Sequence, residues 1–182
     1  MTTDEIGHAL LSIARNAIGE RFGQAAASVS VTAELAAPGA SFVTLTQGGK
    51  LRGCIGSLQP YRPLAADVAG NAVTAAFHDS RFPPLSAKEL AHTRVEVSLL
   101  TPAEPMAFVD EADALARLRP GVDGVILICG ERRSTFLPQV WESLPEARQF
   151  MTQLKLKAGL PADYWDGKIS LARYGVQKWK EN

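Results

Sequence analysis

The chain has 182 residues, of which 46% are hydrophobic and 21% are charged, and it contains only 2 cysteines. These proportions are typical of a globular protein and exclude a disordered chain or a disulfide-rich scaffold, so we expect one or at most two domains. The 19 basic and 19 acidic side chains cancel to a formal net charge of zero, whereas nucleic-acid binders usually carry a basic excess.

Neither a membrane span nor a metal or disulfide site is indicated. No uncharged apolar run approaches the roughly 18 residues that a transmembrane helix needs, and the N-terminal residues TTDEIG lack the basic cluster of a signal peptide. Cys54 and Cys129 lie far apart, with no CxxC spacing and no neighbouring histidine cluster. We therefore expect a cytoplasmic protein with reduced thiols.

Hydrophobic periodicity and turn residues predict the elements in chain order. An amphipathic helix over residues 2–22 opens with a capping-box pattern. Alternating apolar residues predict strands over 29–35 and 42–46, and the turn residues 47–50 predict a hairpin to a strand over 51–57. The same criteria predict helices at 64–78, 86–90, 110–118, after Pro138 and at 145–158, and strands at 95–99, 125–129, 132–136 and 168–178. This mixture, without repeats, favours an α+β fold with a mainly antiparallel sheet flanked by helices.

The most unusual segment is LRGCIGS, residues 51–57. Gly53 and Gly56 weaken the packing of a strand, so another requirement must explain them. A regular pleat puts Arg52 beside Cys54, and a guanidinium near a thiol favours the nucleophilic thiolate. The alternative is that Cys54 is a small buried residue and that the glycines mark a bulge.

A nucleophilic cysteine also needs a general base, and the chain has only three histidines. His8 lies on the first predicted helix and His92 in a predicted turn, which leaves His78 as the candidate. Asp79 and Arg81, just after it, can instead form a local hydrogen-bonded brace in a proline-rich turn. Phosphate-loop, dinucleotide-binding, serine-hydrolase and zinc-protease motifs are all absent.

Five segments occur in a fixed order, namely LRGCIGSL, NAVTAAFHDSRFPPL, PGVDGVIL, TFLPQVWESLP and KAGLPADYW. With these segments the sequence resembles the AMMECR domain family over nearly the whole chain. The resemblance implies one domain over residues 1–182, with two intertwined subdomains. The larger would be built on an antiparallel sheet flanked by helices, the smaller would pack against it, and LRGCIG would lie near their cleft.

The resemblance also supplies the candidate site residues. The catalytic candidates are Cys54 and Arg52, and the ligand-binding candidates are Gly53, Gly56, Asp79, Arg81, Phe82, Gln139 and Trp141. His78 lies at a position that the family pattern leaves variable. This favours electrostatic activation of Cys54 by Arg52 or Arg81 over proton abstraction by His78.

Three functions stay open at this point. The first is an enzyme, or an accessory subunit of one, whose cysteine and arginine cleft binds a small anionic ligand. Microbial relatives are associated with Memo-like and radical S-adenosylmethionine proteins, in what is called the AmmeMemoRadiSam system, so the resemblance implies these partners and leaves the cofactor undefined. The second is a non-catalytic protein-interaction module. The third, nucleic-acid association, is disfavoured by the zero net charge.

Overall fold

The computed structural model describes residues 2–182. The chain divides into two compact units, Met1–Leu100 with Gln177–Asn182, and Thr101–Val176. Each unit contains a four-stranded antiparallel sheet with helices, which confirms the predicted α+β fold. Among the described residues, none of the helices has the length and apolar character that crossing a bilayer demands.

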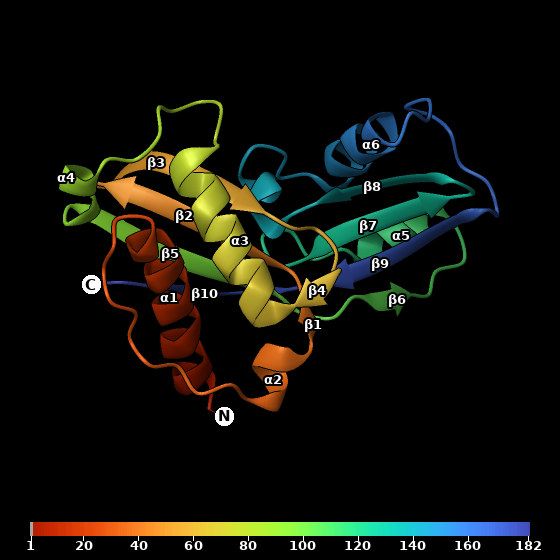
Figure 1. The fold of residues 1–182 in the computed structure, drawn as a ribbon. Helices are drawn as coiled ribbons and strands as arrows, with labels where there is room; N and C mark the ends of the chain where they lie inside the picture. The colour runs from red at the N-terminus through yellow and green to blue at the C-terminus, as the bar shows by residue number, and fades with distance from the viewer. Residues whose placement is uncertain (1) are drawn as a thin grey trace. The chain divides into compact units, whose positions relative to one another are not determined.

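The first unit is built on a sheet with the strand order β10-β5-β2-β3. Its elements are α1 (Thr3–Glu20), α2 (Ala33–Ala36), β1 (Pro38–Gly39), β2 (Ser41–Gln47), β3 (Lys50–Gly56), β4 (Arg62–Pro63), α3 (Leu64–Phe77), α4 (Ala87–Leu90), β5 (Thr93–Leu100) and β10 (Val176–Lys180). Helices α1 and α3 lie side by side over one face of this sheet (Figure 1). The core between the helices and the sheet includes Leu10, Ile18, Val43, Leu45, Val68, Ala72, Val95 and Val97.

Local sequence explains the first helix and the first hairpin. The Thr2 hydroxyl accepts a hydrogen bond from the Glu5 N–H, and the Thr2 N–H donates to the Glu5 carboxylate, so the predicted capping box is formed. The hairpin predicted at residues 47–50 joins β2 to β3. Gly48 and Gly49 have φ values of +55° and +79°, the left-handed backbone that a two-residue hairpin turn requires.

The strand predicted over residues 29–35 is wrong. Residues 24–32 form no regular element, and the short helix α2 follows them. Thr32 caps this helix, because its hydroxyl accepts a hydrogen bond of 3.4 Å from the Leu35 N–H. Leu35 is buried whereas Val31 is 81% exposed, so the alternating residues do not share one face of a sheet.

The second unit has a sheet with the strand order β6-β9-β7-β8. Its elements are β6 (Glu104–Met106), α5 (Glu111–Arg117), β7 (Gly124–Cys129), β8 (Arg132–Phe136), the 3-10 helix η1 (Pro138–Glu142), α6 (Ala147–Lys157) and β9 (Ile169–Tyr174). The helix predicted after Pro138 is therefore a single short 3-10 segment. The core of this unit includes Leu127, Trp141, Phe150, Met151, Leu154 and Leu171.

The single closing strand predicted over residues 168–178 is divided in two. Strand β9 pairs with β6 and β7, whereas β10 belongs to the sheet of the first unit. Gly175 separates them, and it exchanges two hydrogen bonds with Thr101: its N–H donates to the Thr101 hydroxyl, and its carbonyl accepts from the Thr101 N–H. Along the chain, the last strand of the first sheet therefore comes after all the elements of the second unit.

Candidate functional site

The structure divides the predicted site residues between the two units. Those in the first unit are Arg52, Gly53, Cys54, Gly56, Asp79, Arg81 and Phe82, and those in the second are Gln139 and Trp141. The first group lies on β3 and on the segment that follows α3. β3 is an edge strand of its sheet.

The regular pleat expected for LRGCIG is interrupted at Arg52. Two consecutive residues of β2 pair with Leu51 and Gly53, so Arg52 between them has no partner. A β-bulge of this kind breaks the simple alternation of side chains. The expectation that Arg52 and Cys54 share one face of a regular strand therefore fails. The alternative is confirmed in so far as the strand has a bulge, but the bulge lies at Arg52 and not at Gly53 or Gly56, and Cys54 is half-buried rather than buried.

The guanidinium of Arg52 is bound mainly by Glu89 of α4. Its Nε donates to Glu89 Oε1 at 3.0 Å, and its Nη2 donates to the Pro83 carbonyl at 2.9 Å. The hydrogen bonds from Arg52, followed by that from the Ser86 N–H, lower the pKa of Glu89 to about 2. Arg52 is 8% exposed, and its Nη1 makes no hydrogen bond within residues 2–182. The ion pair attaches the bulge to α4, and Nη1 of Arg52 is a buried donor that the pair does not use.

The two glycines of the motif permit close packing. A Cβ on Gly53 would lie 2.2 Å from the carbonyl oxygen of Ala75 in α3, and a Cβ on Gly56 would lie 2.2 Å from the Phe42 ring. Gly53 therefore allows α3 to approach the sheet, and Gly56 accommodates the aromatic ring of its cross-strand partner. Both glycines have a packing role that the sequence alone did not define.

Asp79 and Arg81 hold the outer edge of β3 at Cys54. The Cys54 N–H donates to Asp79 Oδ2 at 2.9 Å, and the Cys54 carbonyl accepts from Arg81 Nη2 at 3.1 Å. Arg81 also binds both oxygens of Asp79, with Nε at 2.9 Å from Oδ1 and Nη2 at 2.7 Å from Oδ2. These contacts, above all the side-chain hydrogen bonds from Arg81, hold the pKa of Asp79 well below its usual range. The local brace considered for these residues is formed, and it extends to the backbone of the motif.

The thiol of Cys54 is half-buried and lies beside two polar groups. Its Sγ accepts a hydrogen bond of 3.3 Å from the hydroxyl of Thr44, the cross-strand partner. The pKa of Arg81 is raised, mainly by its hydrogen bond to Asp79. Its side chain is 52% exposed, and its guanidinium contacts Cys54 through the backbone carbonyl. Among residues 2–182 no hydrogen bond joins the thiol to His78.

Phe82 brings the two arginines of the motif segments together. The Cζ of Arg52 lies 5.9 Å from the centre of its ring, and the Cζ of Arg81 lies 5.6 Å from it. Both distances are within the range of cation–π attraction. The structure therefore groups Arg52, Arg81 and Phe82; Arg81 also contacts the Cys54 carbonyl, whereas Arg52 is directed to Glu89.

Trp141 is a core residue of the second unit. Its indole stacks on Phe150 with 3.8 Å between ring centres and 7° between planes, and its Nε1–H donates to the Asp123 carbonyl at 2.7 Å. It is 3% exposed, whereas Gln139, two residues earlier on η1, is exposed. The ligand-binding role predicted for these two residues stays a prediction, and the observed contacts of Trp141 are those of packing.

Both cysteines are free thiols. Cys129 is buried in the core of the second unit, as its apolar surroundings in the sequence predicted. Within residues 2–182, no three side chains of histidine, cysteine, aspartate or glutamate are grouped as a metal ion would require. Cys54 is the cysteine with a partly accessible side chain.

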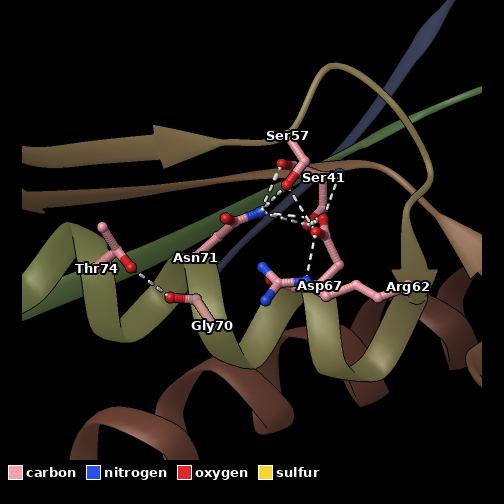
Figure 2. Close-up of polar contacts among 7 residues, drawn as sticks. All are labelled: Ser41, Ser57, Arg62, Asp67, Gly70, Asn71 and Thr74. Carbon is pink, nitrogen blue, oxygen red and sulfur yellow. Dashed lines mark hydrogen bonds and ion pairs between the residues drawn. The ribbon is translucent and has the colours of Figure 1, made fainter.

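A buried polar network around Asp67 was missed in the sequence (Figure 2). Oδ2 of Asp67 accepts hydrogen bonds from the Ser41 N–H at 2.9 Å, from the Ser41 hydroxyl at 2.7 Å and from Asn71 Nδ2 at 3.0 Å. Oδ1 accepts from the Ser57 hydroxyl at 2.6 Å and from Arg62 Nε at 3.0 Å. The carboxylate, which is 1% exposed, thereby ties α3 to the start of β2, to the end of the motif segment and to β4.

A signal for this network was present in the sequence. Asp67 and Asn71 are four residues apart, so they lie on the same side of a helix that is otherwise almost wholly apolar. A polar pair beside a buried stripe indicates a satisfied buried network, because an unpaired carboxylate is costly there. The donors come from Ser41, Ser57 and Arg62, which no local pattern links to α3, so they could not be assigned from spacing.

Two antiparallel sheets with helices, and a cysteine held at an edge strand, define a small α+β protein with a motif-bearing first unit. The AMMECR1 family profile matches residues 11–179, and the chain belongs to the AMMECR1 family. A protein of Methanothermobacter thermautotrophicus is 41% identical over 147 residues, which cover 78% of this chain and 74% of that protein. A protein of Thermotoga maritima is 39% identical over 142 residues, covering 77% and 76%.

The fold also occurs in a solved structure. The crystal structure of an uncharacterized protein from Pyrococcus horikoshii matches with a TM-score of 0.76 at 32% sequence identity, covering 97% of this chain and 91% of that chain. The comparisons therefore agree with the family resemblance that the motif segments carry.

Proposed function

We propose that this protein is an enzyme, or an accessory subunit of one, in which Cys54 is the nucleophile or covalent carrier for a small anionic substrate. The observation that carries the proposal is the position of the thiol: it is half-buried, and its own backbone groups are held by Asp79 and Arg81. A guanidinium near a thiol favours the thiolate, which is the nucleophilic form. Arg81, with a half-exposed side chain, is the group in reach of an anion.

Arg52 has a supporting role in this proposal. Its ion pair with Glu89 fixes the bulge beside Cys54, and its Nη1 retains a donor that forms no hydrogen bond among the described residues. Gly53, Gly56 and Phe82 are further ligand-binding residues in this proposal. Gly53 allows the backbone of α3 to approach, Gly56 leaves room for the Phe42 ring, and the Phe82 ring lies near both guanidinium groups. In this proposal, the main role of Arg52 is therefore to position the bulge beside Cys54.

Thiol reactivity tests this proposal directly. In a Cys129→Ser background, the folded chain should react with iodoacetamide at Cys54 faster than free cysteine does at the same pH. Arg81→Gln should slow that reaction several-fold, because the nearby positive charge is lost. Arg94→Gln, at an exposed arginine of β5, is the matched control and should leave the rate unchanged. A Cys54 no faster than free cysteine, or indifferent to Arg81→Gln, would count against a reactive thiol.

The partners are part of the same proposal. We infer a cytoplasmic setting, where reducing conditions keep both cysteines free, and action together with Memo-like and radical S-adenosylmethionine proteins, which the family resemblance suggests. Co-purification of the full chain with such proteins from a native extract should persist in Cys54→Ser, because that change removes chemistry and leaves the surface intact. Failure of the wild-type chain to retain either partner would contradict this part.

An interaction module is the second candidate, and exposed apolar residues favour it. Leu51, at the start of the motif, and Leu58, just after it, are 45% and 41% exposed. Single apolar residues on a surface are common, but two at the ends of one motif suit a contact with another protein. Leu51→Ser with Leu58→Ser should then abolish partner retention without changing Cys54 alkylation. If retention is unchanged, the motif surface is not the docking site.

A further inference from the structure

The second unit contains a pocket at the beginning of β9 that is separate from the residues of the motif. The pocket has a volume of about 530 Å³, and its walls come from the end of β6, the segment leading to α5, the loop before β9 and the first residues of β9. Pockets of about 300–1,000 Å³ are the size that holds small molecules. All of its lining residues belong to the second unit.

One wall of the pocket is aromatic. The rings of Phe108 and Trp165 lie 5.6 Å apart, centre to centre, at 59° to one another, and both residues are half-buried. Val109, next to Phe108, is 87% exposed at the same pocket. Aromatic rings with accessible surface offer both apolar contact and an electron-rich face to a cation.

The charges of the pocket all have one sign. Asp110 and Asp166 are the ionisable residues that line it, with no lysine, arginine or histidine. Asp110 is fixed by the Asp113 N–H, which donates to its Oδ1 at 2.8 Å. Asp166 accepts hydrogen bonds from the Tyr164 hydroxyl and from the Lys168 N–H, and these lower its pKa. Both carboxylates are therefore positioned by hydrogen bonds from their own segment of the chain.

A buried ammonium lies behind this wall and is already neutralised. Nζ of Lys155 is 6.0 Å from the centre of the Trp165 ring, and it donates to Oε1 of Glu111 at 2.9 Å. Lys155 is 2% exposed and does not line the pocket. Its charge is balanced by Glu111. The ammonium of Lys168 attracts the charge of Asp166 but does not line the pocket, so the charged lining residues are the two carboxylates.

We propose that this pocket binds a small organic cation, an amine or quaternary ammonium compound with an apolar portion. The rings of Phe108 and Trp165 contact the cation and its apolar portion, and Asp110 and Asp166 provide the opposite charge. An anion would be repelled by two carboxylates there, and a purely apolar ligand would offer them no opposite charge. The site is independent of Cys54, so it adds a ligand class to the protein beyond the function proposed above.

The test uses benzyltrimethylammonium as the probe and phenylacetate as the anionic control of similar size. The full chain, labelled with nitrogen-15, is titrated at constant ionic strength while the indole N–H signals of Trp141, Trp165 and Trp179 are followed by NMR. We expect a saturable shift of the Trp165 signal with the cation, no comparable shift with phenylacetate, and little change at the other two indoles. The absence of a saturable shift at Trp165, or an equal response to phenylacetate, would overturn the proposal.

Variants separate a built site from general attraction of charges. Asp110→Asn with Asp166→Asn keeps the side-chain acceptors and removes the charge, and it should weaken binding about tenfold. Asp163→Asn, at an exposed acid outside the pocket, is the matched control and should bind as wild type. Thermal unfolding of each variant checks that the fold is kept. If Asp163→Asn weakens binding as much as the double change, the binding is non-specific and the proposal is wrong.

Discussion

The backbone N–H of Cys54 donates a hydrogen bond of 2.9 Å to the buried carboxylate of Asp79. Because β3 is an edge strand, this N–H has no neighbouring strand to pair with. Asp79 and Arg81 satisfy the N–H and the carbonyl of the same residue, so side chains here replace a strand. The candidate site therefore depends on an ion pair that also protects the edge of the sheet.

Asp79→Ala should destabilise the protein by about 2–3 kcal/mol, because it leaves the Cys54 N–H and the Arg81 guanidinium without their charged acceptor. Chemical denaturation at pH 7 measures this change. Asp163→Ala, at an exposed acid, should stay within about 0.5 kcal/mol of wild type. Equal stability of the two variants would mean that Asp79 does not hold the edge of β3.

Glu89→Gln should alter how stability depends on pH. The pKa of Glu89 is lowered to about 2 in the folded protein, mainly by Arg52, and it is about 4.3 in an unfolded chain. Stabilisation from the ionised carboxylate is therefore complete above the unfolded value and is lost as the pH falls towards 2. We expect the variant to be about 1 kcal/mol less stable than wild type at pH 7, given the partial exposure of Glu89.

Denaturation at several pH values checks the sign of this effect. The difference between wild type and Glu89→Gln should shrink steadily between pH 5 and about pH 2, because Glu89 gains a proton there. Glu142→Gln, at an exposed glutamate of η1, should show no such trend. A difference that is constant over this range would show that the charge of Glu89 does not stabilise the fold.

Gly53→Ala should destabilise the protein severely, by about 3 kcal/mol or more. The added Cβ would lie 2.2 Å from the carbonyl oxygen of Ala75, and a helix backbone cannot move aside as a side chain can. Gly167→Ala is the control, because a Cβ there meets no atom within 4 Å. Thermal unfolding distinguishes them, and a Gly53→Ala protein as stable as the control would rule out the close approach of α3.

The same glycine shows how far the sequence could predict the site. Two glycines in an apolar strand indicated that space was needed, and a bulge was one of the two interpretations. The side of the strand on which Arg52 would emerge could not be predicted, because the bulge depends on which residue of β2 each residue of β3 faces. The register between two strands is set by the hairpin turn and by packing, and local hydrophobic periodicity carries no information about it.

Most helices and strands were predictable because the signals that start and end them are local. Capping residues and hairpin glycines act within a few residues of the chain, so the start of α1 and the turn between β2 and β3 followed from the sequence. The failure at residues 29–35 has the opposite cause. A strand forms only where a neighbouring strand pairs with it, and local alternation of apolar residues does not show whether one does. At the end of that segment, Thr32 instead caps the short helix α2.

Asp67→Ala should cost about 3–5 kcal/mol, because it removes the acceptor that ties β2, Ser57 and β4 to α3 and leaves buried donors unpaired. Asp67→Asn should cost less, since one oxygen remains to accept hydrogen bonds. Arg62→Ala, at a side chain that is 43% exposed, should cost less than about 1 kcal/mol. Hydrogen exchange of β2 and α3 measures where protection is lost, and uniform protection in Asp67→Ala would contradict a structural role.

Trp141→Ala should unfold or strongly destabilise the second unit, by about 3–5 kcal/mol, because its indole stacks on Phe150 and its N–H binds the Asp123 carbonyl. Gln139→Ala, on the exposed side of the same 3-10 segment, should leave stability unchanged. Trp141→Phe keeps an aromatic ring and removes the Nε1–H, so it should lower the melting temperature by less than Trp141→Ala does. Thermal unfolding measures both changes, and a Trp141→Ala protein as stable as Gln139→Ala would contradict the packing role.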